Sequence, residues 1–166
     1  TIENWNQVPY DAGIHMDVFQ TFANNGDVSN GIIIERNLIR NCLYTQLGYM
    51  TDDGFLSRIT NWTFRNNIFI NISGDLQINV PNCKIYNNTF YKCGLVKGFP
   101  LAFRTSNDRG NGHNPTIYGN IFYLCGQNTA TNYHGFYDLV DTDGGPAIQN
   151  VVIYCFYVIG TEPGLA

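Results

Sequence analysis

The segment KIYNNTFYKC, residues 84–93, decides the fold because its pattern recurs along the chain. Four segments align on one another without internal gaps: residues 34–42 (IERNLIRNC), 64–72 (FRNNIFINI), 85–93 (IYNNTFYKC) and 117–125 (IYGNIFYLC). The first position is always large and apolar, and the sixth is Ile or Phe. The fourth position is always asparagine, at Asn37, Asn67, Asn88 and Asn120. The chain therefore contains four copies of one structural unit.

The spacing and composition of the copies predict a stack of β-strands. Successive asparagines lie 30, 21 and 32 residues apart, a spacing typical of solenoid repeats. β-Branched and aromatic residues dominate each copy without helical periodicity, and Gly, Asn and Asp between the copies disfavour helices. In a parallel stack, strands about 4.8 Å apart place the same repeat position over itself. We expect the first positions to form an apolar interior column of Ile34, Phe64, Ile85 and Ile117.

We expect each repeated asparagine to lie at a tight bend. Asparagine tolerates the left-handed backbone conformation that such a bend requires. Its side-chain amide can also hydrogen-bond the asparagine of the next coil, giving an asparagine ladder. The ninth position predicts a buried column of free thiols, formed by Cys42, Cys93 and Cys125. The chain has no C-x-x-C motif, so a zinc site is not expected.

This repeat, read as apolar-x-x-Asn-x-apolar, resembles that of the right-handed parallel β-helix family, the pectate-lyase-like proteins. The resemblance covers nearly the whole chain. It implies an all-β fold, a right-handed parallel β-helix (solenoid) of about five to six coils, in a single domain over residues 1–166. It leaves the activity open, because solenoid folds carry unrelated functions.

Composition bounds the partners. Hydrophobic residues make up 44% of the chain, which is ample for a core, and only 13% of residues are charged, against about 25% in ordinary soluble proteins. The net charge of −4 and the absence of a Lys/Arg run predict no nucleic-acid partner. No stretch of 18 apolar residues is present, so no membrane span is expected. We expect a secreted or cell-surface location.

Neither end of the sequence has an amphipathic segment that would cap a solenoid. An uncapped stack exposes apolar core and unpaired strand edges, which are normally covered. We therefore expect either a segment of a longer solenoid or a homo-oligomer that assembles through the solenoid ends. Near the second end, residues 149–159 repeat the pattern with Cys155 in the place of the asparagine.

A second strand is expected after each copy. The candidates are residues 46–51, 76–80, 100–105 and 135–140, and residues 15–21 precede them by one coil. These segments would form one wall of the stack, and it is the most polar wall that the sequence can assemble.

The strongest chemical motif of this wall is His15-x-Asp17-x-x-Gln20. A histidine held by an aspartate can act as a general base, and a glutamine can orient a sugar hydroxyl. In a polysaccharide lyase, Arg104 could neutralise a uronate carboxylate, while Arg109 and His113 of the loop 105–114 could bind substrate. The alternative interpretation is that the motif only satisfies hydrogen bonds at a corner of a coil.

Acidic residues offer two further kinds of site. Asp141 and Asp143, two residues apart, would face the same way, and they are candidates for a catalytic and a substrate-binding carboxylate of a glycoside hydrolase. Asp52 and Asp53 offer hard oxygen ligands for calcium, the one cofactor that the sequence suggests. The alternative for both segments is a solvated turn.

Two functions follow. The first is a carbohydrate-associated protein that binds or cleaves a polysaccharide or oligosaccharide, as a lyase or a hydrolase would. The alternative is a non-catalytic structural or self-assembling solenoid.

Overall fold

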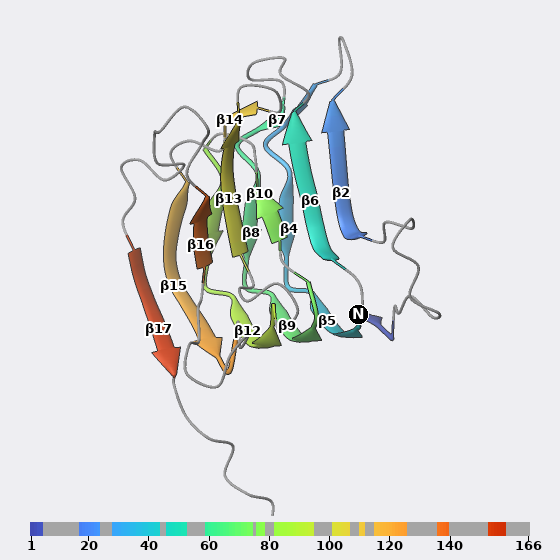
Figure 1. Cartoon of the computed structure of the whole chain (residues 1–166), viewed down its shortest axis with the longest axis vertical. Coiled ribbons are helices and arrows are strands. Elements are labelled where there is room, and N and C mark those ends of the chain that lie inside the picture. The colour runs from blue at the N-terminus through green and yellow to red at the C-terminus, as the bar shows by residue number, and fades with distance from the viewer. Residues whose placement is uncertain are drawn as a thin grey trace, which may run out of the picture.

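The computed structural model describes the strands and most corners of an all-β chain (Figure 1). The described residues are 1–4, 17–23, 28–43, 46–52, 59–74, 76–78, 82–94, 101–106, 110–111, 115–125, 136–139 and 153–158, and in some strands, β13, β16 and β17 among them, the backbone alone is described. No helix occurs in these residues. The expectation of an all-β fold is confirmed to this extent.

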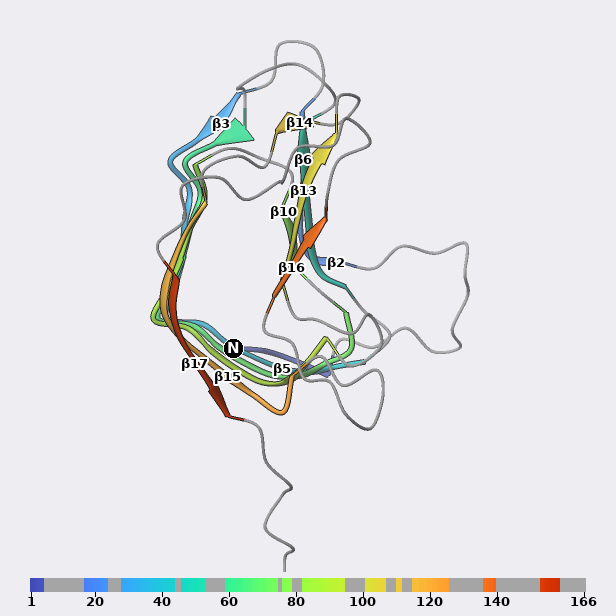
Figure 2. The same ribbon diagram turned by 60° about the vertical axis from the view of Figure 1, so that its left-hand side comes forward.

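The four copies form a parallel sheet that bends at the repeated asparagine. Its strand order is β1-β5-β9-β12-β15-β11-β8-β4, and β17 also pairs with β15. Its strands are β1 (Ile2–Glu3), β4 (Ile33–Glu35), β5 (Leu38–Cys42), β8 (Thr63–Arg65), β9 (Ile68–Ile72), β11 (Lys84–Tyr86), β12 (Thr89–Cys93), β15 (Thr116–Tyr123) and β17 (Ile153–Val158). β15 runs through the bend and pairs with both β11 and β12. The two arms of this sheet form two walls in Figure 2.

The second sheet forms the opposite wall in Figure 2 and is the wall expected after each copy. Its strands are β2 (Asp17–Ala23), β6 (Gln46–Asp52), β10 (Leu76–Ile78), β13 (Leu101–Ser106), β14 (Gly110–Asn111) and β16 (Phe136–Leu139). All pair in parallel except β14, which is antiparallel to β13. A third, two-stranded sheet joins β3 (Ser29–Asn30) and β7 (Ile59–Thr60). The arrangement is compatible with a parallel β-helix.

The core consists of columns of identical repeat positions. The register pairs Ile34 with Phe64, Phe64 with Ile85, and Ile85 with Ile117, as the alignment of the copies predicts. In the sixth position the rings of Phe69 and Phe90 stack at 4.8 Å between centroids. Another stacked contact, at 4.9 Å, joins Phe90 to Phe122. Regular repetition along the chain therefore becomes regular packing across the strands.

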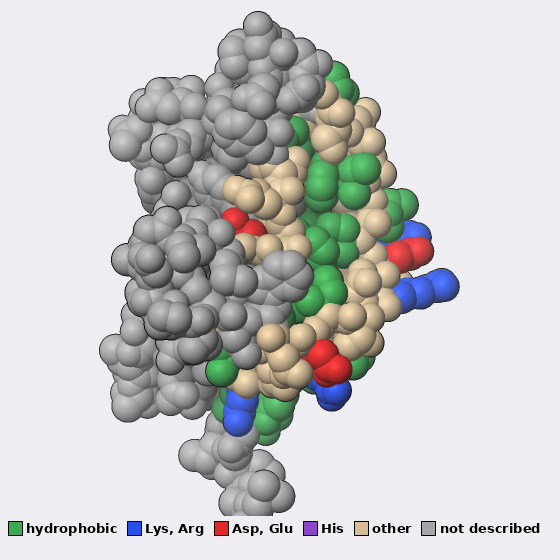
Figure 3. All heavy atoms as spheres, turned by 90° about the vertical axis from the view of Figure 1, so that its right-hand side faces the viewer, with side chains coloured by type: hydrophobic (Ala, Val, Ile, Leu, Met, Phe, Trp, Pro, Cys, Tyr) green, Lys and Arg blue, Asp and Glu red, His purple; other side chains and the backbone are tan. Residues whose placement is uncertain are grey.

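The first strands leave part of this core near the surface. Ile2, Val18, Phe19 and Ile34 pack against the core but are only partly buried. Figure 3 views the molecule from the side on which β2 lies in Figure 1, and hydrophobic side chains form a band through the middle of its described surface.

The bend of each copy is made by the residue before the repeated asparagine. Arg36, Asn66, Asn87 and Gly119 have φ angles of 55°, 55°, 53° and 63°, in the left-handed region. The expectation that the repeated asparagines themselves take this conformation was wrong, because none of the four has a positive φ. The physical reason is that two adjacent residues have separate roles. The first residue turns the chain, and the asparagine that follows keeps an ordinary backbone conformation and directs its side-chain amide into the stack.

The two middle amides of the column, those of Asn67 and Asn88, are saturated by their neighbours. Asn88 Nδ2 donates to Phe64 O at 2.9 Å and to Asn120 Oδ1 at 3.0 Å. Asn88 Oδ1 accepts from the backbone N and from Nδ2 of Asn67, at 3.0 and 2.9 Å. The same pattern links Asn37 to Asn67. Two donors and two acceptor sites are all that an asparagine amide offers.

The last strand breaks the pattern by one residue. β17 pairs Tyr154 with Tyr118 and Phe156 with Ile121, so that Cys155 alone stands opposite Gly119 and Asn120. Cys155 thus takes the place of both the bend residue and the asparagine, whereas the sequence predicts that it replaces the asparagine alone.

Candidate functional site

The predicted wall is present as a parallel sheet, but only part of its predicted site falls in the described residues. His15, Asp53, Arg109, His113, Asp141 and Asp143 lie outside them. Asp17 and Gln20 lie on β2, Asp52 ends β6, and Arg104 lies on β13, all within one sheet. The catalytic, substrate-binding and calcium-binding roles of these residues stay predictions.

Asp17 and Gln20 belong to opposite faces of β2. Residues two apart on a strand share a face, so Asp17 lies on the side of Phe19, whose ring meets that of Phe64 in the core at 6.0 Å. Asp17 Oδ1 is buried, whereas Gln20 is exposed. A ligand on the outer surface would therefore meet Gln20, while Asp17 faces the interior.

The register also separates Asp17 from Arg104. Arg104 lies three strands away and five residues further along the strand direction, so the two Cα atoms are about 20 Å apart. Asp52 is nearer to Arg104, at two strands and one residue, or about 10 Å between Cα atoms. The structure thus brings Asp52 towards Arg104 and does not bring Asp17 to either.

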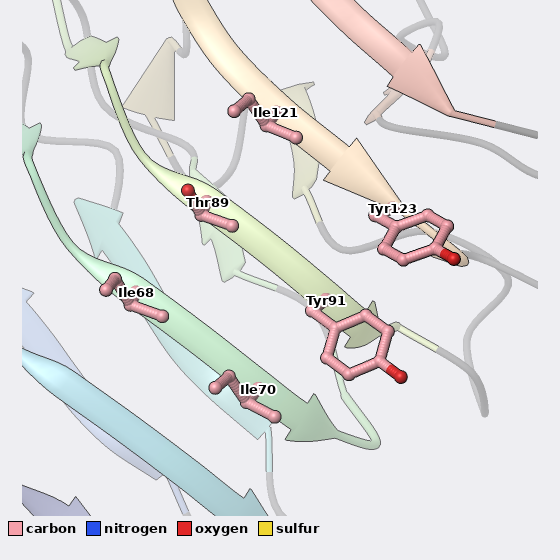
Figure 4. A pocket seen from close by; sticks show the side chains of 6 residues that line it. All are labelled: Ile68, Ile70, Thr89, Tyr91, Ile121 and Tyr123. Carbon is pink, nitrogen blue, oxygen red and sulfur yellow. The ribbon is translucent and has the colours of Figure 1, made fainter. Parts of the chain in front are cut away.

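A different surface feature stands out on the outer face of the first sheet. A shallow groove of about 400 Å³ crosses β9, β12 and β15. Its lining, labelled in Figure 4, is Ile68, Ile70, Thr89, Tyr91, Ile121 and Tyr123. These side chains project from the same face of the sheet in Figure 4.

The lining forms two columns that cross the strands. Ile68, Thr89 and Ile121 are in register with one another and form the first column. The second column is Ile70, Tyr91 and Tyr123, in which the two tyrosine rings stack at 5.3 Å between centroids. Between the columns lie the positions of Phe69, Phe90 and Phe122, whose buried side chains point inward. The floor of the groove is therefore strand backbone.

Sequence analysis missed this groove because it predicted only the columns of the interior and did not consider the outward positions of the same strands. A strand alternates its faces, so the position after each core Phe points outward. Tyr91 and Tyr123 follow Phe90 and Phe122, and their half-buried hydroxyphenyl rings follow from that alternation. The signal was the choice of Tyr over Phe at that position, since a tyrosine hydroxyl favours contact with water.

The four cysteines whose side chains are described offer no nucleophile at the surface. Cys42, Cys83, Cys93 and Cys125 are buried thiols outside any disulfide, as predicted for the three in the repeat. Burial raises the pKa of Cys83 to about 12, although a backbone hydrogen bond from Trp62 opposes this. Burial and a hydrogen bond with Cys125 hold the pKa of Cys93 well above its ordinary value. Thiolate chemistry is therefore disfavoured at both thiols.

Two searches of the described residues are negative. They contain no cluster of three or more His, Cys, Asp or Glu side chains arranged to hold a metal ion. They also contain no helix long and apolar enough to cross a membrane. Comparisons of the chain with protein-family models, with curated proteins and with solved structures found no match.

Proposed function

We propose that the chain is a parallel β-helix that binds a polysaccharide in the groove across β9, β12 and β15. The single observation that carries this proposal is the pair of outward columns, in which Tyr91 and Tyr123 stand beside Thr89 and three isoleucines. Ile68 and Ile121 are 46% and 41% exposed and lie on either side of Thr89 in the first column, which is a large apolar exposure for one face of a sheet. Exposed apolar groups that are contiguous mark contact sites.

The chemistry of the lining suits a sugar chain. A pyranose ring has an apolar C–H surface and a rim of hydroxyls, so its binding site needs apolar area with a few hydrogen-bonding groups. The isoleucines and the tyrosine rings supply the apolar area. The hydroxyls of Thr89, Tyr91 and Tyr123 supply the hydrogen-bonding groups, and each can donate and accept a hydrogen bond.

The proposal is of binding rather than cleavage. Lysis would need a base and a group that neutralises a carboxylate, and hydrolysis would need two carboxylates about 5 to 10 Å apart. Of the residues proposed for these roles, Asp17 and Arg104 belong to the opposite wall, and the register separates them. The groove itself is lined by none of them.

Affinity electrophoresis in gels that contain a panel of polysaccharides tests the proposal. The wild-type chain should be retarded by at least one polysaccharide, and Tyr91→Ala/Tyr123→Ala should lose that retardation. The matched control is Tyr86→Ala/Tyr118→Ala, which removes another stacked pair, with ring centroids 4.7 Å apart, from the other arm of the same sheet. Equal loss in both double variants, or no retardation by any polysaccharide, would contradict the proposal.

A second candidate function, self-assembly, is favoured by the partly buried core at the first strands. Ile34 packs against the core yet remains partly accessible, whereas Ile33 beside it is 52% exposed on the outward side of the strand. A second copy stacked on this face would cover Ile34. Sedimentation velocity should then show an oligomer that Ile34→Lys dissociates and Ile33→Lys does not. A monomer at all concentrations would exclude this candidate.

A further inference from the structure

The lining of the groove also indicates which kind of polysaccharide would bind, because the lining is uncharged. None of its six lining residues bears an ionisable carboxylate or an amine. We propose that its ligand is a neutral, extended glycan that lies across the strands, along the direction in which they stack, and binds without calcium. This inference rests on the proposed polysaccharide binding and specifies the substrate of the same site.

Charge complementarity excludes an acidic ligand. A polyuronate would bring carboxylates against isoleucine and tyrosine side chains, and a carboxylate that loses water without gaining a partner is strongly disfavoured. At the β5 end, Arg40 is already paired with Glu3, with 2.5 Å between Nε and Oε2. The positive charge at that end is therefore balanced within the protein.

Lys92 follows the lining residue Tyr91 in the chain, and its ammonium group lies against a ring of the protein. Its Nζ lies 5.5 Å from the centroid of the Tyr91 ring, a cation–π geometry. One ammonium group cannot match a polymer that carries a carboxylate on every unit. The ammonium group lies over the face of the Tyr91 ring and is not among the residues that line the groove.

The direction of the ligand follows from the two columns. They stand two residues apart on each strand, so their Cα atoms are separated by about 6.6 Å, and a chain that runs across the strands can contact both columns at once. The columns continue along the stack. In the first column the register places Leu38 beside Ile68 at one end and Phe156 beside Ile121 at the other. In the second column it places the charged Arg40 beside Ile70 at one end and Val158 beside Tyr123 at the other. A chain of linked rings can therefore follow apolar positions over several strands.

Binding to four immobilised glycans tests the inference: a neutral glucan, a neutral mannan, a polygalacturonate and an alginate, each with calcium and with a chelator, at low and high salt. We expect retention on a neutral glycan that neither chelator nor salt changes. Tyr123→Ala should weaken it about tenfold or more, a loss of about 1.4 kcal/mol. Lys92→Gln should change it less than about twofold, because the ammonium is not a ligand group.

Three outcomes would overturn the inference, and they separate it from the proposed function. Retention on the acidic glycans alone, lost at high salt or in Lys92→Gln, would refute the neutral class but keep polysaccharide binding. Retention on no glycan would refute both. A wild-type dimer in sedimentation that Ile121→Lys dissociates would show that a second copy covers the groove, and this too would refute both.

Discussion

Replacing Asn88 by alanine tests the saturated amides that link the copies. Its side chain is 1% exposed and takes part in four hydrogen bonds, with Phe64 O, Asn120 Oδ1 and two nitrogens of Asn67. A typical hydrogen bond contributes about 1 kcal/mol net, so the four together amount to about 4 kcal/mol. The loss is large because each abandoned partner stays buried in the stack, away from water.

The position of an asparagine in its column should set the size of the effect. Asn37 begins the column and is only partly buried, and its Nδ2 donates to Glu35 O at 3.0 Å and to Asn67 Oδ1 at 3.1 Å. Two side-chain bonds predict a loss of about 2 kcal/mol for Asn37→Ala. The free energy of unfolding should therefore fall about twice as far for Asn88→Ala as for Asn37→Ala.

Urea unfolding followed by circular dichroism measures both losses, provided that the dependence of free energy on urea is unchanged. Asn87→Gly is the matched control, because it changes an exposed asparagine next to Asn88 and keeps the left-handed bend, at φ 53°. We expect that control to shift stability by less than about 1 kcal/mol. Losses of the same size in Asn37→Ala and Asn88→Ala, or below about 1 kcal/mol in both, would refute the reasoning.

Further expectations concern a bend, a thiol and the ring column. Gly119→Ala should lower the thermal unfolding temperature more than Gly31→Ala. Both glycines have positive φ, but only at Gly119 would an added Cβ collide with Asn87 Oδ1. In an Asn87→Gly background the difference between the two substitutions should disappear. Because burial raises the folded-state pKa of Cys83 to about 12, stability should be undiminished below the unfolded pKa of about 8.5 and fall as pH rises above it. Cys83→Ala should flatten that fall between pH values of about 8 and 11 in urea midpoints. Phe90→Ala, at a fully buried and stacked ring, should cost about 3 to 5 kcal/mol.

The alignment of the copies was enough to predict which residues meet. Parallel strands in register place equal repeat positions together, so the gapless alignment of 64–72 on 85–93 already contains the pairing of Phe69 with Phe90. It could not tell which residue turns the bend. Asn66 and Asn67 are chemically identical, and only the direction of the second amide, into the stack, distinguishes their roles.

The candidate site was less predictable than the fold. It depends on which face of the sheet each side chain occupies and on how far apart the residues lie along the strand direction. The order of segments predicted that Asp17 and Arg104 share a sheet, and they do. The offset between them arises from where each strand begins relative to its neighbours, which loop lengths alone do not reveal. Polar residues in one wall are therefore a weaker indication of a site than residues at equal register.

The groove follows from the same register that builds the core. Each strand that buries Phe69, Phe90 or Phe122 must present its next residue on the outer face, and in two of the three strands this residue is tyrosine. The backbone hydrogen bonds of the sheet fix the spacing of the strands, and thereby the spacing of the inner rings, at 4.8 and 4.9 Å, and of the outer rings, Tyr91 and Tyr123. The outer column thus needs no loop to hold it in place. A binding surface of this kind is pre-organised by the core, so a substitution such as Phe90→Ala should weaken glycan binding as well as folding.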